Sequence, residues 1–455
     1  MKYRLMEHQN YTLSMMEANP SLGLFLHMGL GKTAIALTYV YRHLKKGDFR
    51  DGVLVVCPAS LIPSWEQAID DMINFEEFDS RAVQLLKDSI TIRSFQKMYK
   101  TTKVPVKRTG NQVITRRSIA LREDIDKPWS CFIVDEAHQC SAHNAVQTKA
   151  AITIAKLSKH RYVLTGSPTH GGKGRPDFQK LFGLIQIITA GGAFKNWSEF
   201  SNKAVTAVDR WYKPLEYNDA YCKKLMADYS VVYRIEDCID MPDKVEQDVP
   251  CPLAEKAMYN DLRIGDVMKY GLSIENAGGQ YTKMLQICSG SMKVDDTNTL
   301  RLKTTKDDAL ADLLNSTDDP IVIFCNYRAS IDHAEAVAKK AGRKVVVFDG
   351  RSKTETWKDF QNGKADCIIC QYQSGGVGLN LQRAHQMILY EPCFSALLLA
   401  QAVARIYRKG QTSKCLYYYL YTPNTLERKV WTVVKSGVDL NEVLLERLSK
   451  GELEF

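Results

Sequence analysis

The strongest constraint on the fold is a regular alternation of short apolar runs with longer amphipathic stretches. This alternation is typical of parallel α/β units, because a strand buried on both faces needs a continuous apolar run and each crossover helix needs one apolar face. The runs form two clusters, one before residue 170 and one after residue 320, with a mostly helical region between them. The pattern therefore predicts an α/β fold with strands at 53–57, 131–134, 162–165, 321–325, 344–348, 367–370 and 386–390.

The length of the chain indicates more than one domain. At 455 residues it is too long for one ordinary core and suggests two or three domains. A boundary is expected within 240–252, where Met-Pro-Asp-Lys and Pro-Cys-Pro interrupt the pattern. We therefore predict one α/β domain over residues 1–240 and a second over residues 241–455.

Composition narrows the class of protein without fixing its function. Hydrophobic residues at 45% and charged residues at 25% are typical of soluble globular proteins. A net charge of +9 permits a nucleic-acid partner without requiring one. No apolar run approaches the roughly 20 residues that span a bilayer, and the N-terminus is too polar for a signal peptide. We expect a cytoplasmic protein with no membrane association.

The twelve cysteines show no framework spacing, and most lie in apolar surroundings. Reduced, buried thiols explain this pattern better than disulfides do. Cys367 and Cys370 form a lone Cys-x-x-Cys pair, which without a second pair is weak support for a zinc site.

The segment 97–122 interrupts the α/β rhythm. It carries eight basic residues and no acidic ones. Val-Pro-Val at 104–106 and Val-Ile-Thr at 113–115 flank Thr-Gly-Asn, which predicts two short strands joined by a turn. A solvated basic loop and a DNA-contacting hairpin both explain this pattern equally well. The hairpin interpretation assigns DNA contacts to Lys107, Arg108, Arg116 and Arg117.

A phosphate-binding loop is indicated by Met-Gly-Leu-Gly-Lys-Thr at 28–33, between an apolar run and a helical stretch. Its glycines let backbone N–H groups wrap phosphates, and the helix N-terminus adds the positive end of its dipole. Lys32 can reach the β- and γ-phosphates, and the Thr33 hydroxyl can ligate Mg²⁺. The common form of this loop has glycine where this chain has Leu26, so a chance Gly-Lys-Thr turn is the alternative.

An acidic box, Asp-Glu-Ala-His at 135–138, follows the apolar run 131–134 directly. Asp135 at a strand end can hold the Mg²⁺ shell, and Glu136 can orient or deprotonate the attacking water. An ordinary helix N-cap would explain the same pattern. The phosphate loop in the same half of the chain favours the catalytic interpretation.

Gln401, Arg405 and Arg408 are spaced i, i+4 and i+7 within 395–409, which predicts that they share one face of a helix. A solvated polar stripe is the simpler alternative. The functional interpretation is an arginine finger that neutralises charge developing on the γ-phosphate. A finger from the second domain would make hydrolysis depend on closure of a cleft.

With these elements in this order, the chain resembles superfamily-2 helicases, and within them the Swi/Snf-type ATPases, from about residue 5 to residue 430. In the first half, 5–9 is similar to the adenine-sensing glutamine motif, 55–65 to a motif that contacts the nucleic-acid backbone, and 164–168 to the coupling motif. In the second half, 348–350, 375–381 and 401–411 keep the family's order and spacing, and the linker 233–246 is similar to its bridge.

The resemblance implies two RecA-like parallel-sheet domains, with ATP and Mg²⁺ in the cleft between them and DNA across both. It assigns catalysis to Lys32, Asp135, Glu136, Arg405 and Arg408, with Thr33 and Asp135 holding Mg²⁺. It assigns ATP binding to Gln9, Met28, Gly29, Leu30, Gly31, Lys32, Thr33, Ala34, Gly376, Arg405 and Arg408. Coupling falls to His138, Thr165, Ser167 and Gln401. Contacts with the DNA backbone fall to Pro58, Ser60, Ser94, Phe95, Thr169, Asn326 and Gly378.

The chain departs from the family's pattern in two places. Gln-Tyr-Gln at 371–373 stands where Ser-Thr-Arg is usual, and Tyr-Glu-Pro-Cys-Phe at 390–394 stands where an Asp and a Trp are usual. It also lacks flanking chromatin-reading modules and long insertions. In this it resembles small bacteriophage-encoded helicases that act on branched DNA.

These features predict an ATP-driven DNA helicase that remodels forked or four-way DNA by branch migration, in replication, recombination or repair. The alternative within the same chemistry is a duplex translocase that displaces or slides bound proteins without separating strands. A catalytically silent binding module is disfavoured by the intact catalytic residues, and an RNA helicase by the Swi/Snf-like second half. We expect a monomer with no obligate protein partner.

Overall fold

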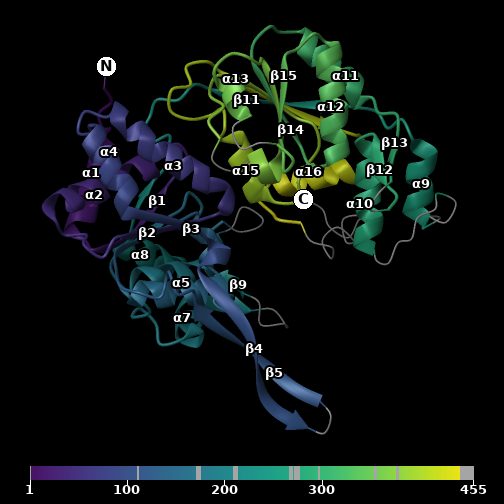
Figure 1. Cartoon of the computed structure of the whole chain (residues 1–455). Helices are drawn as coiled ribbons and strands as arrows, with labels where there is room; N and C mark the ends of the chain where they lie inside the picture. The colour runs from purple at the N-terminus through teal and green to yellow at the C-terminus, as the bar shows by residue number, and fades with distance from the viewer. Residues whose placement is uncertain are drawn as a thin grey trace. The chain divides into compact units, whose positions relative to one another are not determined.

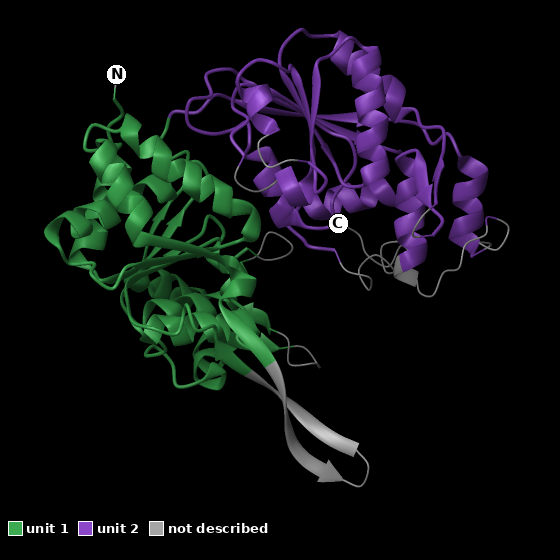
Figure 2. Ribbon diagram, viewed as in Figure 1, with its two compact units in different colours: residues 1–170, 176–239 green, residues 171–175, 240–455 purple. Residues whose placement is uncertain are grey.

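The computed structural model describes residues 2–109, 112–170, 176–208, 214–265, 270, 277–295, 298–352, 356–375 and 379–440. The chain divides into two compact units, one formed by residues 1–170 and 176–239 and the other beginning at Asp240 (Figure 2). Each unit contains one six-stranded sheet in which every neighbouring pair of strands is parallel. The predicted α/β class with two parallel sheets is confirmed.

The sheet of unit 1 has the strand order β10-β1-β7-β6-β2-β3. Its strands in chain order are β1 (Ser21–Leu26), β2 (Val53–Cys57), β3 (Ile90–Ser94), β6 (Trp129–Asp135), β7 (Ser158–Leu164) and β10 (Ser230–Tyr233). Every residue of β6 is buried, because Phe132 and Val134 join the core on one face while Cys131 and Ile133 point to the other.

Helices cover both faces of this sheet (Figure 1). One group comprises α1 (Glu7–Ala18), α2 (Lys32–Lys46), α3 (Ile62–Asp71) and α4 (Ser80–Ser89). The other group comprises α5 (Val146–Lys156), α6 (Lys180–Ile188), α7 (Trp197–Ala204) and α8 (Asp219–Tyr229). A short antiparallel pair, β8 (Val205–Val208) and β9 (Pro214–Tyr217), follows α7.

The sheet of unit 2 has the strand order β11-β18-β17-β14-β16-β15. Its strands are β11 (Lys244–Pro250), β14 (Ile321–Cys325), β15 (Val345–Phe348), β16 (Cys367–Gln371), β17 (Gln386–Leu389) and β18 (Cys415–Tyr421). The helices are α9 (Lys256–Ile264), α10 (Ala277–Cys288), α11 (Lys306–Asn315), α12 (Arg328–Lys340), α13 (Trp357–Gln361), α14 (Tyr372–Gly375), α15 (Ala396–Val403) and α16 (Leu426–Lys435). A short antiparallel pair joins β12 (Ser291–Lys293) to β13 (Thr299–Arg301), and α11 and α12 pack against the central strands.

All seven predicted strands are present, as β2, β6, β7, β14, β15, β16 and β17. The predicted strands did not include β3, β10, β11 and β18 of the two sheets. The strand β11 occupies most of the segment 240–252, which was expected to interrupt the pattern. This strand lies at the edge of its sheet and is mostly half-buried or exposed, so it tolerates Lys, Glu, Gln and Asp and shows no apolar run.

The predicted hairpin in the basic segment is confirmed, and its strands are longer than expected. They are β4 (Tyr99–Thr109) and β5 (Gln112–Leu121), which pair antiparallel with an irregularity between Pro105 and Lys107. Tyr99 and Leu121 at the base of the hairpin pack against the core of unit 1. Residues 110–111 and the side chains of residues 102–118 lie outside the described part of the chain.

The twelve cysteines are free, and all but the half-buried Cys238 are buried. Cys367 and Cys370 lie within β16, where burial raises the pKa of both thiols. Among the residues that the structure describes, no helix is long and apolar enough to cross a bilayer.

Candidate functional site

The site in unit 1 is built at the carboxyl ends of three neighbouring strands. In the sheet, β7 lies between β1 and β6. The loop 28–33 follows β1, the acidic box begins at the last residue of β6, and Thr165 follows β7 directly. Because the carboxyl ends of parallel strands meet at one edge of a sheet, these three segments lie together although they are far apart in sequence.

The loop 28–33 depends on glycine at two positions. Gly29 and Gly31 have φ angles of 85° and 80°, in the left-handed region, and Gly31 is the residue that precedes α2. A Cβ atom on Gly31 would collide with Nε2 of Gln9. The left-handed backbone conformation and the lack of space therefore both disfavour a side chain at this position. The helix begins at Lys32, which places its N-terminal N–H groups at the loop.

Lys32 extends back over the end of β1. Its Nζ donates to the carbonyl oxygen of Leu26 at 2.8 Å and to that of His27 at 3.4 Å. Leu26 occupies the position where glycine is more common in such loops, and here its backbone carbonyl accepts a hydrogen bond from the ammonium group. The departure in sequence therefore leaves the lysine held at the loop.

Gln9 links the start of α1 to the loop. Its Oε1 accepts a hydrogen bond from the Met6 N–H at 2.9 Å, and its Nε2 donates to the Leu30 carbonyl at 3.1 Å. The His8 ring nitrogen Nε2 lies 3.2 Å from the same carbonyl. Both side chains are buried, so α1 and the loop form one packed assembly.

Asp135 is the last residue of β6 and is 7% exposed. Its Oδ2 accepts a hydrogen bond from Nε1 of Trp65 and its Oδ1 accepts one from the Glu136 N–H, each at 2.9 Å. Burial, reinforced by the charge of Glu136, raises the pKa of Asp135 to about 6, while the Lys32 cation lowers it. The sequence did not predict the hydrogen bond from Trp65 to Asp135, because the position of Trp65 at the end of the motif 55–65 carries no information about this contact.

Glu136 has a φ of 49°, which is uncommon for a residue with a side chain and is found preferentially at functional sites. Its side chain makes no capping hydrogen bond to the short 3₁₀ helix Ala137–Cys140 that follows. The ordinary N-cap interpretation is therefore not what this geometry shows. Oε2 of Glu136 instead lies 3.3 Å from Nδ1 of His138.

Three of the four residues predicted to couple ATP hydrolysis to movement, His138, Thr165 and Ser167, meet beside Glu136. The fourth, Gln401, lies in α15 of unit 2. Nδ1 of His138 also lies 3.4 Å from Oγ1 of Thr165, which accepts a hydrogen bond from the Ser167 N–H at 3.1 Å. The Thr165 N–H in turn donates to the carbonyl of Leu24 in β1. A chain of contacts thus runs from the acidic box to the segment after β7 and back to β1.

In unit 2, the prediction of one helical face for Gln401, Arg405 and Arg408 is wrong. The helix α15 ends at Val403, and both arginines lie in the turns that follow. The Arg405 backbone carbonyl accepts a hydrogen bond from the Leu381 N–H, so a bond to another segment takes the place of a continued helix. The Arg405 side chain stays close to α15, because its Nε donates to the carbonyl of Gln401.

The two arginines converge nevertheless. Nη1 of Arg405 and Nη1 of Arg408 donate to the same carbonyl, that of Leu379, at 3.1 and 3.0 Å. Burial lowers the pKa of Arg408, and Arg405 is buried. The predicted ATP-binding residue Gly376 and the predicted DNA-binding residue Gly378 lie outside the described residues.

The residues predicted to contact DNA follow strand ends in both units. Pro58 and Ser60 follow β2, Ser94 ends β3, and Asn326 follows β14. Ser60 is exposed and Pro58 is half-buried, whereas Ser94 and Asn326 are buried. The side chains of Lys107, Arg108, Arg116 and Arg117 are outside the described part, so their assignment stays a prediction.

Comparison with known proteins places this arrangement in a family context. Residues 8–306 match the SNF2-related domain, and residues 305–410 match the helicase conserved C-terminal domain. The DNA repair and recombination protein RDH54 of Saccharomyces cerevisiae (strain JAY291) is 22% identical over 89% of this chain and 49% of its own length. The chain therefore spans about half the length of this relative.

Other relatives have lengths closer to that of this chain. The probable global transactivator of Orgyia pseudotsugata multicapsid polyhedrosis virus is 24% identical over 93% of this chain and 88% of its own length. The uncharacterized ATP-dependent helicase YqhH of Bacillus subtilis is 22% identical, over 92% and 75%. The Sulfolobus solfataricus SWI2/SNF2 ATPase core in complex with dsDNA is 20% identical, with a TM-score of 0.40 over 99% of this chain and 94% of that one.

Replacing Gly31 with alanine is expected to abolish binding of Mg-ATP, because the new Cβ would collide with buried Gln9 and distort the loop. Gly47, at the other end of α2, is a matched control. Its φ of 78° carries the same backbone strain, but no atom lies within 4 Å of an added Cβ. Gly47→Ala should cost about 1–2 kcal/mol of stability and leave binding intact. Titration with a fluorescent ATP analogue, alongside thermal unfolding, checks both variants, and equal binding by both would contradict the account of the loop.

Proposed function

Since this chain belongs to the family of proteins with an SNF2-related domain, we propose that it is an ATP-driven motor that moves along DNA. The observation that carries the proposal is the meeting of the loop 28–33, the acidic box and the segment after β7 at adjacent strand ends. A relative described as an ATP-dependent helicase and one described as a DNA repair and recombination protein support it.

In the proposed reaction, Lys32 and the N–H groups of the loop bind the ATP phosphates. Thr33 and Asp135 would hold Mg²⁺, since this ion takes few oxygen ligands from the protein and completes its shell with water and phosphate. The carboxylate of Asp135 retains acceptor capacity beyond its bonds to Trp65 and Glu136. A bound Mg²⁺ would supply charge stabilisation at the phosphates.

Glu136 is the group that orients the attacking water or accepts its proton. Its neighbour His138 contacts Thr165, so a change at the phosphates can reach the segment after β7 through these side chains. Arg405 and Arg408 are proposed to stabilise charge on the γ-phosphate. Their convergence on Leu379 O supports a joint action of the two guanidinium groups.

We further propose that the DNA is branched, and that the motor remodels forks or four-way junctions. The support is the hairpin β4–β5, a pair of long antiparallel strands in a segment with eight basic residues and no acidic ones. Such an element suits contact with DNA backbones at a junction. A duplex translocase that displaces proteins without separating strands is the competing outcome of the experiments below.

Replacing Lys32 with alanine is expected to reduce ATP hydrolysis to background, because the phosphates lose their cation. Lys46→Ala, at the far end of the same helix, should hydrolyse ATP as the wild type does. Phosphate release measured with single-stranded, duplex, forked and four-way DNA and with RNA checks the proposal. The motor proposal would be wrong if the wild-type protein released phosphate with none of these nucleic acids. Stimulation of phosphate release by RNA alone would indicate an RNA helicase.

Replacing Lys107, Arg108, Arg116 and Arg117 with alanine is expected to reduce processing of forked and four-way DNA at least tenfold. ATP hydrolysis without DNA should be retained, since these residues lie on the hairpin and not on the loop 28–33. A charge-matched control replaces four exposed lysines, Lys223, Lys224, Lys339 and Lys340. Gel assays of fork unwinding, junction migration and triplex displacement distinguish remodelling of branched DNA from translocation along duplex DNA. Unchanged junction processing would contradict the role of the hairpin, and triplex displacement without unwinding would favour the duplex translocase.

A further inference from the structure

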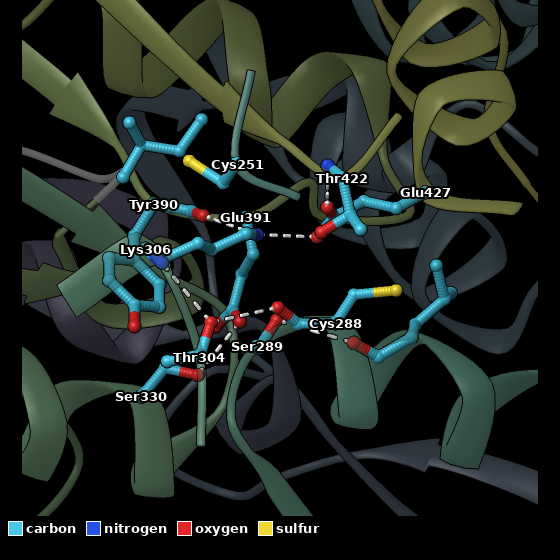
Figure 3. Close-up of polar contacts among 12 residues, drawn as sticks. Cys251, Cys288, Ser289, Thr304, Lys306, Ser330, Tyr390, Glu391, Thr422 and Glu427 are labelled. Carbon is cyan, nitrogen blue, oxygen red and sulfur yellow. Dashed lines mark hydrogen bonds and ion pairs between the residues drawn. The ribbon is translucent and has the colours of Figure 1, made fainter. Parts of the chain in front are cut away.

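A buried ionic network lies in unit 2, and none of its members is among the residues assigned to ATP (Figure 3). Lys306, the first residue of α11, is fully buried, and its Nζ donates to Glu427 Oε1 at 2.6 Å and to the Tyr390 carbonyl at 2.8 Å. Glu391 and Glu427 are also fully buried. Lys306 forms an ion pair with Glu427, and its charge also lowers the pKa of Glu391. One buried cation thus offsets two buried carboxylates, and such a costly arrangement calls for a structural or functional reason.

The two carboxylates serve different parts of unit 2. Glu427 lies in the first turn of α16, and its Oε2 accepts a hydrogen bond from the Thr422 N–H at 2.7 Å, which closes the connection from β18 to α16. Glu391 follows β17 and reaches the neighbouring strand β14 instead. The network therefore has one end at α16 and another at the connection from β14 to α12.

Glu391 holds the turn after β14 by three hydrogen bonds. Its Oε1 accepts from the N–H groups of Asn326 and Tyr327, each at 2.9 Å, and its Oε2 accepts from the Ser330 hydroxyl at 2.7 Å. A carboxylate at this place also faces the positive end of the α12 dipole. Burial raises the pKa of Glu391, while Lys306 and the hydrogen-bond donors lower it.

The same turn is held from a second direction. Nε2 of Gln371, at the end of β16, donates to the Asn326 carbonyl at 3.2 Å. The hydroxyl of Tyr372 donates to the Glu391 carbonyl at 3.0 Å. Both places where the sequence departs from the family's pattern, 371–373 and 390–394, therefore converge on Asn326.

We propose that Glu391, supported by Gln371, is a positioning residue that fixes the turn 326–328 in the shape that meets the DNA backbone. Asn326 itself is 9% exposed, whereas Arg328, the first residue of α12, is exposed and carries the charge that a DNA phosphate would recognise. Glu391 acts through this turn and touches neither ATP nor DNA. The inference rests on the proposed function, since it requires DNA as the partner of unit 2.

The test compares two buried glutamates of one network. Glu391→Gln and the gentler Gln371→Ala are expected to raise the concentration of duplex DNA that half-saturates ATP hydrolysis by about 3- to 10-fold. The rate at saturating DNA should be retained, since the turn affects affinity and not chemistry. Glu427→Gln removes a carboxylate charge of the same network, so Glu427→Gln and Glu391→Gln should lower the thermal unfolding midpoint by similar amounts. Glu427→Gln should nevertheless leave unchanged the concentration of DNA that half-saturates ATP hydrolysis.

A double-mutant cycle separates positioning from general damage to the fold. Arg328→Ala alone should raise the DNA requirement, and in that background Glu391→Gln should add less than about twofold, because the group it positions is gone. Glu391→Gln and Glu427→Gln with equal DNA requirements would overturn the inference, as would independent effects of Glu391→Gln and Arg328→Ala.

Failure of the proposed function gives a different result. Wild-type ATP hydrolysis that does not respond to DNA would contradict the motor itself. In that case, fluorescence anisotropy measures the affinity of the same variants for labelled duplex DNA and tests the positioning role of Glu391. Equal affinities of the wild type and Glu391→Gln, or no DNA binding by the wild type, would overturn it.

Discussion

Interior strands of both sheets are buried on both faces, and this burial decides where polar side chains can lie. A strand buried on both faces has nowhere to place polar groups except beyond its ends, and parallel strands bring their carboxyl ends to one edge. In unit 1 this edge gathers the loop after β1, the acidic box after β6 and Thr165 after β7. Local hydrogen bonds then hold the loop in place, since Lys32 donates to the Leu26 carbonyl and Gln9 donates to the Leu30 carbonyl.

The buried strands and the phosphate loop could be predicted from the sequence, because apolar runs indicate buried strands and a Gly-Lys-Thr turn after such a run indicates a phosphate loop. The misses have physical reasons. The edge strand β11 is solvated and carries charged residues, so it has no apolar signal. The helix expected through Arg408 stops at Val403, because Arg405 bonds with Leu379 and Leu381, segments that local periodicity does not sense. The contact between Trp65 and Asp135 spans 70 residues and was invisible for the same reason.

Each unit places a buried carboxylate at or just beyond the end of an interior strand of its sheet, and the two carboxylates have different partners. Asp135 accepts hydrogen bonds from Trp65 and Glu136, while the Lys32 cation lowers its pKa against the effect of burial. Glu391 accepts three hydrogen bonds from the turn into α12, and Lys306 offsets its charge. Burying either charge is costly, and the hydrogen bonds offset the cost only while the surrounding segments keep their shape.

We propose that hydrolysis of ATP needs Arg405 of unit 2 as well as the loop 28–33 and the acidic box of unit 1. The most direct test of this proposal is Arg405→Ala, with the exposed neighbour Lys409→Ala as the control, in single-turnover hydrolysis of Mg-ATP with saturating duplex DNA. ATP binding is read separately by titration, and thermal unfolding verifies that the variants are folded. Arg405→Ala is expected to bind ATP within about twofold of the wild type and to hydrolyse it at least about 100-fold more slowly. Hydrolysis at the wild-type rate by folded Arg405→Ala protein would contradict the proposal.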